Sequence, residues 1–163
     1  MDKKEERKLL QAKRNALTEE EVRANSELIA KNILESQIYK QADIIMGYLA
    51  FSKEASIDLV LQQALAGGKI VCVPQVVYGL DFMRSVRLRQ MDNLSLDKFF
   101  IRTPMEPCEI ISPQILNLVL VPGVGFTKRG ARIGMGKGYY DHFLPQATQA
   151  ATMLFRATSN LIK

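Results

Sequence analysis

The chain has 163 residues, of which 47% are hydrophobic and 24% are charged, so its length suits one domain with a substantial core. No apolar run is long enough to cross a bilayer, and the N-terminal MDKKEERKLL lacks the apolar segment of a secretory signal, so we expect a cytoplasmic protein with no membrane association. The net charge of +5 suits an anionic small molecule as well as it suits nucleic acid. Two cysteines outside any C-x-x-C motif argue against a disulfide framework or a zinc site, and Cys72 reads as a core residue.

Two helices are predicted at the start of the chain. Residues 2–17 are rich in strong helix formers. Thr18, followed three residues later by Glu21, predicts a capping box and hence a second helix. The inner stripe of that helix is expected at Val22, Ile29 and Ile33.

Strands alternate with helices through the rest of the chain. We expect strands at 43–51, 69–74, 80–88, 115–122 and 151–157, and helices at 56–69 and 139–143. The first of these helices should end at Gly67 or Gly68, the strand 69–74 should end at Pro74, and residues 91–113 should be irregular. This alternation predicts an α/β fold with a mostly parallel sheet covered on both faces, with ligands bound beyond the carboxyl ends of its strands.

The stretch GARIGMGKGYYDHF, residues 130–143, follows the strongest predicted strand. Its alternating glycines permit close approach to the backbone, and successive peptide N–H groups in such a loop can cradle an anion. Arg132 and Lys137 would add positive charge, so the stretch predicts a phosphate site. It matches neither the P-loop motif nor the dinucleotide-binding motif. The glycines concerned are Gly134, Gly136 and Gly138.

The residues that close this stretch leave alternatives open. Asp141 lies in the first turn of the predicted helix, where a carboxylate is either favoured by the helix dipole or placed to hold magnesium beside phosphates. One of Tyr139 and Tyr140 is expected in the core, and the other could stack on a planar ring. His142 is expected at the surface.

The same stretch resembles the signature of the 5-formyltetrahydrofolate cyclo-ligase (5,10-methenyltetrahydrofolate synthetase) family, roughly G-x-R-L-G-x-G-x-G-Y-Y-D preceded by a strand and PGxxF; here the lead-in is LVLVPGVGF. Lys3 and Arg7 fit the K-x-x-x-R with which the family opens, four residues apart on one helical face. YLAFSKEAS supplies the family's apolar residue and glutamate at Leu49 and Glu54. The resemblance extends over nearly the whole chain and is weakest between residues 91 and 113.

The resemblance implies one domain over residues 1–163, a three-layer sandwich like that of the NagB/RpiA/CoA-transferase proteins. It also implies conversion of 5-formyltetrahydrofolate to 5,10-methenyltetrahydrofolate with ATP and magnesium. Phosphate contacts then fall to the three glycines and to Lys3, Arg7, Arg132 and Lys137, with Tyr139 and Tyr140 at the ATP. Leu49, Glu54 and one of the two tyrosines would hold the folate, and Asp141 the magnesium. Arg132 and Lys137 are the expected catalytic residues.

The chain departs from the family pattern at several points. Met135 stands where other members carry arginine or tyrosine, and Ile57 replaces a usual threonine, for which Ser56 could cap the following helix instead. Family members also usually continue past the end of this chain through a further loop and strand that carry an acidic residue. We therefore expect a domain that is short at its C-terminus.

Two alternatives stay open beside the enzyme. One is a non-catalytic relative that binds nucleotide or folate without turnover. The other is a nucleic-acid-binding module, favoured by the basic residues of 2–17 but opposed by Glu5 and Glu6 among them and by the lack of a known binding motif. We expect a monomer that binds small molecules and no nucleic acid.

Overall fold

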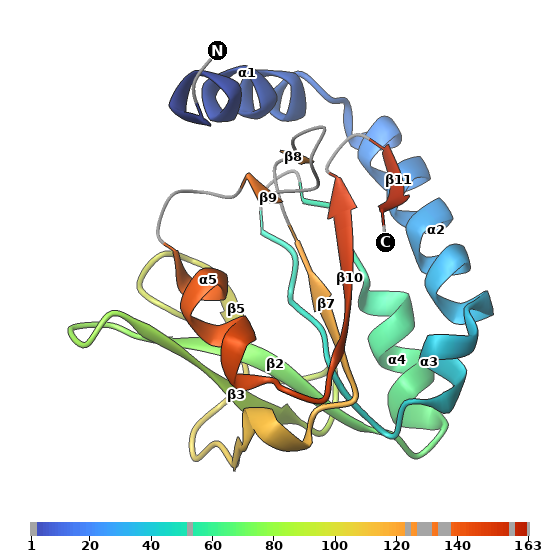
Figure 1. Ribbon diagram of the computed structural model, residues 1–163, viewed down its shortest axis with the longest axis vertical. Coiled ribbons are helices and arrows are strands. Elements are labelled where there is room, and N and C mark those ends of the chain that lie inside the picture. Colours follow the sequence, from blue (N-terminus) through green and yellow to red (C-terminus); the bar gives the residue numbers. More distant parts are fainter. Residues whose placement is uncertain are drawn as a thin grey trace.

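A computed structural model describes residues 3–51, 54–122, 125–126, 132–133, 138–156 and 159–162 (Figure 1). The helices are α1 (Lys3–Asn15), α2 (Glu19–Glu35), α3 (Gln37–Gln41), α4 (Asp58–Ala66) and α5 (Tyr139–Phe143), with short 3-10 turns η1 (Pro113–Ile115) and η2 (Leu144–Gln146). The strands are β1 (Ile44–Met46), β2 (Ile70–Val77), β3 (Phe82–Leu88), β4 (Ser95–Leu96), β5 (Arg102–Thr103), β6 (Ile110–Ile111), β7 (Leu118–Val121), β8 (Gly125–Phe126), β9 (Arg132–Ile133), β10 (Ala151–Arg156) and β11 (Ser159–Ile162). Within these described ranges, none of the helices has both the length and the apolar composition that a membrane span requires.

The second helix begins as its local sequence predicts. The amide of Glu21 donates to Thr18 Oγ1 at 3.1 Å, and the amide of Thr18 donates to Glu21 Oε1 at 3.0 Å. This reciprocal pair is the capping box, and it satisfies two amides that have no partner within the helix. Of the predicted inner stripe, Ile29 and Ile33 are fully buried, whereas Val22 near the start of the helix is only half-buried.

Seven strands form the main sheet in the order β11-β10-β7-β1-β2-β3-β6. The four central strands, β10, β7, β1 and β2, run parallel, whereas β3, β6 and β11 pair antiparallel toward the edges. All four residues of β7 are buried, which explains its unbroken apolar run, because a parallel strand is covered on both faces. The predicted mostly parallel α/β sheet is thus confirmed.

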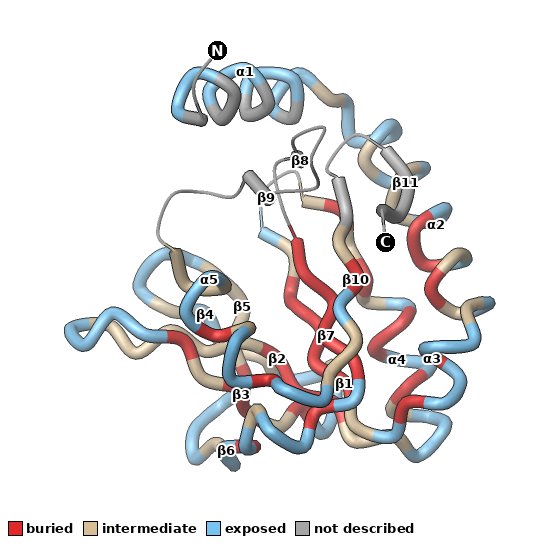
Figure 2. The backbone as a smooth tube through the Cα atoms, in the orientation of Figure 1, coloured by how far each residue is buried: buried red, intermediate tan, exposed pale blue. Residues whose placement is uncertain are grey.

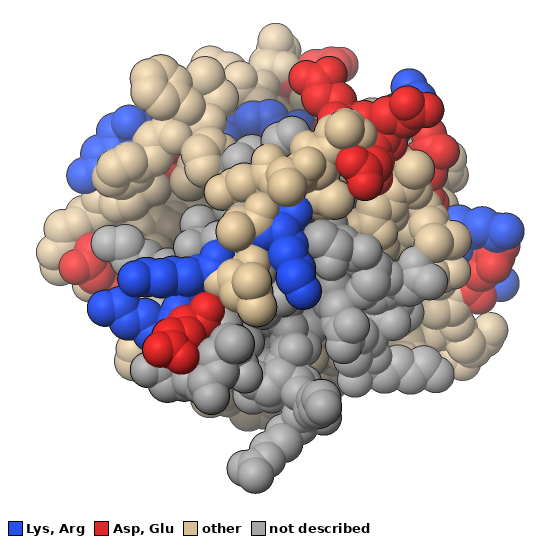
Figure 3. All heavy atoms as spheres, turned by 90° about the horizontal axis from the view of Figure 1, so that it is seen from above, with Lys and Arg blue, Asp and Glu red and all other residues tan. Residues whose placement is uncertain are grey.

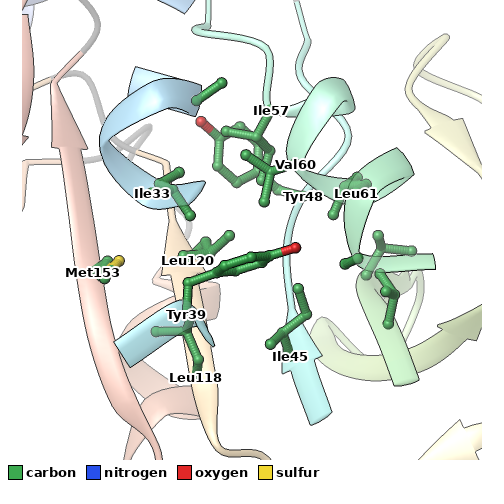
Figure 4. Packing of buried hydrophobic residues seen from close by; sticks show 14 of the residues in the cluster. Ile33, Tyr39, Ile45, Tyr48, Ile57, Val60, Leu61, Leu118, Leu120 and Met153 are labelled. Atoms are coloured by element: carbon green, nitrogen blue, oxygen red, sulfur yellow. The ribbon is translucent and has the colours of Figure 1, made fainter. Parts of the chain in front are cut away.

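Helices cover both faces of this sheet, which makes three layers. On one face α2, α3 and α4 pack on the strands, and Figure 4 shows Ile33, Val60 and Leu61 meeting Ile45 and Leu120 from the sheet. On the other face α5 places Phe143 in a second core cluster with residues of β1, β2 and β7. Figure 2 shows that burial is concentrated in the central strands and in the sides of the helices that face them.

The ends of two strands differ from the prediction, and one strand is added. β1 ends at Met46, because the chain beyond Gly47 folds into a loop, although Gly47 N still donates to Cys72 O at 2.8 Å. β2 continues through Pro74 to Val77; beyond Cys72 it pairs only with β3, and an edge of this kind tolerates a residue with no N–H. The chain also adds β11 after β10, where the sequence suggested a last strand at 151–157.

The irregular segment predicted at 91–113 contains only two-residue strands. β4 and β5 form a small sheet of their own, and β6 pairs with β3 at the edge of the main sheet. β3 accordingly lies one strand from the edge, as its more polar sequence indicates.

Chain connections in the central sheet reverse direction between β1 and β7. From β1 the chain crosses through α4 to β2 on one side, and from β7 it crosses through α5 to β10 on the other side. The two crossovers lie on opposite faces of the sheet (Figure 1). Adjacent parallel strands whose connections part in this way leave a crevice between their carboxyl ends, and open α/β sheets bind ligands there.

Candidate active site at the carboxyl edge of the sheet

Two segments follow the strands on either side of the switch point. The loop after β1, residues 47–57, carries Leu49 and Glu54, and the segment after β7, residues 122–138, carries the glycines and Lys137. Helix α1 crosses over this end of the sheet and contacts β9 (Figure 1). The described elements next to these groups are the ends of β1 and β7 and helix α1, which are far apart in the chain and lie at one edge of the sheet.

The loop after β1 is tied to itself and to its surroundings. Phe51 N donates to Glu54 Oε1 at 2.9 Å, and Glu54 N donates to Phe51 O at 3.2 Å. Glu54 is half-buried, whereas Leu49 is only 6% exposed and belongs to the core on the α4 side. Ser56 Oγ accepts from Asp58 N at 3.2 Å, so Ser56 does help to cap α4 where Ile57 cannot.

Tyr48, which sequence reasoning missed, supports this loop from within. Its hydroxyl donates to Ala55 O at 2.8 Å, and the side chain is buried. Burial raises the pKa of Tyr48 well above its ordinary value, and Glu54, Tyr140 and Asp58 raise it further through their charges. The phenol is therefore a neutral group that supports the loop from within.

The segment after β7 enters α5 at Gly138, which has φ +73° and stands at the N-cap. This left-handed conformation strains residues with a side chain, so glycine suits the position. Gly134, Gly136 and Lys137 lie outside the described residues. Arg132 belongs to β9, where it pairs with Phe126 of β8. Helix α1, which contacts β9, carries Lys3 and Arg7. The side chains of these three cations lie outside the described part of the structure.

Helix α5 spans Tyr139–Phe143, the range that the sequence predicts. Tyr139 and Tyr140 are both half-buried and both pack against the core cluster on the α5 side. Tyr139 also lines a small pocket of about 180 Å³ between α5, β3 and β6. The expected division into one core tyrosine and one free ring is thus replaced by two half-buried rings.

Asp141 and His142 are exposed, the latter as predicted. The described residues contain no cluster of three or more His, Cys, Asp or Glu side chains able to hold a metal on their own. An exposed carboxylate in the first turn of α5, directly after the glycine segment, does fit magnesium, which binds through one or two carboxylates plus phosphate oxygens.

Positive charge lies over this edge. Lys4, Lys8 and Lys13 are exposed on α1. Figure 3 looks down onto the edge and shows Lys and Arg side chains at its centre and left, with acidic side chains beside those on the left and a larger acidic group toward the upper right. A cationic rim of this kind favours an anionic ligand.

A second group missed by sequence reasoning is Arg102 of β5, whose guanidinium reaches the loop after β1. It pairs with Asp58, 44 residues earlier in the chain. Spacing along the sequence gave no signal for this pair, because an isolated arginine in an irregular segment has no periodic pattern.

The fold defines a class: a three-layer α/β protein whose parallel strands have a topological switch point, the place where open α/β sheets bind ligands. A sequence profile of the 5-formyltetrahydrofolate cyclo-ligase family matches residues 1–158, and the chain belongs to this family of enzymes.

Relatives with assigned names agree with this placement. The probable 5-formyltetrahydrofolate cyclo-ligase of Caenorhabditis elegans is 33% identical over 147 residues, which cover 86% of this chain and 71% of the relative. The 5-formyltetrahydrofolate cyclo-ligase of Mus musculus is 30% identical over 146 residues, covering 86% of this chain and 72% of the relative.

Solved structures agree as well. The NMR structure of Aquifex aeolicus 5,10-methenyltetrahydrofolate synthetase is 28% identical, with a TM-score of 0.79 over 98% of this chain and 81% of that one. The 5,10-methenyltetrahydrofolate synthetase of Mycoplasma pneumoniae, 22% identical, shares the fold with a TM-score of 0.70 over 93% of this chain and 89% of that one.

Proposed function

We propose that this protein converts 5-formyltetrahydrofolate to 5,10-methenyltetrahydrofolate with consumption of ATP, assisted by magnesium, and with release of ADP and phosphate. The observation that carries the proposal is the pairing of β1 with β7, the two strands that lead into the proposed binding segments. The loop that resembles the family's folate-binding element and the glycine segment that resembles its phosphate-binding element follow adjacent parallel strands, β1 and β7. Two substrates held by these segments would therefore lie side by side.

The reaction needs activation because the oxygen of a formyl amide is a poor leaving group. In the proposed route the γ-phosphoryl group passes from ATP to the formyl oxygen, and ADP departs. The neighbouring folate nitrogen then attacks the activated carbon, the ring closes, and the oxygen leaves with the phosphate. Such a route asks the protein for positioning and for stabilisation of negative charge, and it needs no covalent nucleophile.

The triphosphate half is assigned to the glycine segment and the cations around it. Backbone N–H groups of Gly134, Gly136 and Gly138 would cradle the phosphates. Lys3 and Arg7 from α1, with Arg132 and Lys137, would neutralise charge on the nucleotide and on the phosphoryl group in transfer. The support for these roles is the contact of α1 with β9, which brings both cation-bearing elements to the same edge.

The folate half is assigned to the loop after β1 and to α5. Glu54 would accept hydrogen bonds from the pterin ring, and Leu49, packed into the core, would form the floor beneath it. One of the two half-buried tyrosines of α5 would contact the folate ring. Tyr140 is the better candidate, because Tyr139 lines the pocket toward β3 and β6.

Asp141 is assigned to magnesium. A bound ion there would neutralise phosphate charge during transfer. The residue's own contribution would be a single exposed carboxylate, so affinity for the ion would depend on the nucleotide being present.

The proposal is tested by incubating the purified protein with ATP, magnesium and 5-formyltetrahydrofolate and following the near-ultraviolet absorbance of the methenyl product. Lys137→Ala and Asp141→Ala should each lower kcat by about 100-fold or more, because each removes charge stabilisation from the transferring group. Lys40→Ala on α3 and His142→Ala on α5 are the matched controls and should keep wild-type turnover. Binding of nucleotide or folate without product would instead identify a non-catalytic relative. Retention of nucleic acid that weakens with salt, without stabilisation by ATP, would identify a nucleic-acid-binding module.

A further inference from the structure

The strongest unexplained contact near the site joins the segment 91–113 to the loop after β1. Arg102 Nη1 donates to Asp58 Oδ2 at 2.9 Å, and Nη2 donates to Asp58 Oδ1 at 3.1 Å. The pair is bidentate, a geometry in which the planar guanidinium holds its partner in a fixed orientation. Nη2 also donates to the carbonyl oxygen of Ala50 at 3.5 Å.

These contacts fall at both ends of the loop. Ala50 follows Leu49 near the start of the loop, and Asp58 is the first residue of α4, directly after the loop ends. One side chain therefore holds the two ends together while Glu54 lies between them. Tyr48 closes the same loop from inside through its bond to Ala55, so Arg102 forms the outer of two braces.

The segment that carries Arg102 is itself anchored. Asp97 Oδ1 accepts from Phe99 N at 2.8 Å and from Ile101 N at 3.0 Å, which fixes the turn before β5. Asp97 Oδ2 accepts from the hydroxyl of Tyr78 at 2.8 Å, directly beyond the end of β2. The guanidinium is thus connected through Asp97 and Tyr78 to the main sheet and does not project from a free loop.

The other ion pairs in the described part of the chain differ in kind. Arg87 and Arg89 both meet Glu109 at the β3–β6 edge, where hydrogen bonding between strands already sets the spacing. The Arg102–Asp58 pair joins two segments that share no sheet, and its two side chains are only 31% and 33% exposed. If this ion pair is removed, no hydrogen bonding between strands remains to hold the loop against β5.

We propose that Arg102 is a positioning residue for the folate half of the site, holding the loop 47–57 in the geometry that presents Glu54. This proposal rests on the proposed function for the identity of the ligand. The role of the 91–113 segment is then to brace the substrate loop from outside the main sheet. The bidentate geometry also predicts that lysine, which offers a single point of charge, replaces Arg102 only in part.

The test compares Arg102→Met and Arg102→Lys with Arg89→Met, which removes an arginine from the exposed Glu109 pair. Hydrogen exchange of the Phe51 and Glu54 amides reports opening of the loop, because both amides are bonded within it. Arg102→Met should speed exchange at both amides by about 10-fold, Arg102→Lys by less, and Arg89→Met by no more than about twofold.

Steady-state kinetics supply the second readout. Arg102→Met should raise the KM for 5-formyltetrahydrofolate by about 10-fold and leave the KM for ATP within about twofold, because only the folate half is displaced. The double variant Asp58→Asn/Arg102→Met should have the same KM for 5-formyltetrahydrofolate as Arg102→Met alone, because both substitutions break the same contact.

Each outcome decides the question. Equal rates of amide hydrogen exchange in Arg102→Met and Arg89→Met would show that Arg102 does not hold the loop in place, whatever the activity of the variants. Faster exchange with equal rises in both KM values overturns its assignment to the folate half. If the wild-type chain forms no product, the proposed function fails. The positioning role is then decided by whether added 5-formyltetrahydrofolate protects the Phe51 and Glu54 amides from hydrogen exchange. Loss of this protection in Arg102→Met supports the role, and unchanged protection overturns it.

Discussion

At the scale of single residues, the packing at Gly47, where β1 ends and the loop begins, leaves no room for a side chain. A Cβ atom at this position would meet Leu61 Cδ2 at 2.5 Å and Ile57 Cδ1 at 3.1 Å. Both neighbours are fully buried, so neither can swing into solvent. The absence of a side chain at Gly47 therefore allows α4 to pack close to the end of β1, and this packing positions the loop that connects them.

We predict that Gly47→Ala lowers the free energy of unfolding by about 1–3 kcal/mol through overpacking. Urea denaturation of the wild type and the variant measures the loss. The matched test repeats the substitution in a Leu61→Ala background, where the main clash is removed and the additional cost of Gly47→Ala should shrink. An equal cost in both backgrounds would show that steric conflict with Leu61 is not the cause.

At the scale of elements, Asn117 organises the ends of the strands opposite the site. Its Oδ1 accepts from Asp43 N at 3.0 Å and from Ile44 N at 2.9 Å, and its own backbone N donates to Ile44 O at 2.8 Å. Its carbonyl oxygen accepts from Ala151 N at 2.9 Å. One residue before β7 thus aligns β1, β7 and β10, the three strands on either side of the switch point.

Asn117→Ala should cost about 1–3 kcal/mol of stability, because two backbone amides at the start of β1 lose their shared acceptor. Asn117→Asp keeps an acceptor oxygen and should retain most of that stability. The two variants are compared by thermal and urea denaturation at neutral pH. An alanine variant as stable as the wild type would mean that water satisfies both amides and that the side chain does not set the alignment.

The elements that sequence predicts well are those with local signals. The Thr18–Glu21 capping box starts α2, Gly67 ends α4, and α5 covers the predicted residues, since each signal lies within a few positions of its effect. The end of β1 and the passage of β2 through Pro74 are set by neighbouring strands and are invisible locally.

The candidate site divides in the same way. Residue types and spacing identified the glycine segment, and the family resemblance identified Glu54. That the two follow neighbouring strands depends on the strand order, which has no local signal. The brace from Arg102 to Asp58 joins positions 44 apart in the chain, and only the folded structure reveals it.

At the scale of the whole molecule, stability should decline in alkaline solution. Cys72 is fully buried, and this burial raises the pKa of its thiol to about 12; Arg87 acts in the opposite direction and Glu109 in the same one. Burial also raises the pKa of Tyr48 and of Tyr78, the latter assisted by its hydrogen bond to Asp97. Each of these groups is held neutral in the folded state while the unfolded chain can ionise it.

The sign follows from proton binding. Because the folded pKa of Cys72 exceeds the ordinary thiol value of 9.0, the folded state binds more protons between about pH 9 and pH 12, and the stability present below this window is lost as pH rises through it. Between pH 8 and pH 10 the contribution of Cys72 should fall by about 1 kcal/mol. Urea denaturation at both values measures the fall, which Cys72→Ala should reduce. An identical pH dependence in the two proteins would exclude Cys72 as the cause.

The joining of two substrates at the switch point is the central claim, and an isotope transfer tests it most directly. 5-Formyltetrahydrofolate labelled with ¹⁸O in its formyl group is incubated with the protein, ATP and magnesium, and the released phosphate is analysed for the label. If the γ-phosphoryl group passes to the formyl oxygen, the methenyl product should form and the phosphate should carry the ¹⁸O. Unlabelled phosphate, or no product from a folded protein that binds both ligands, would contradict the account.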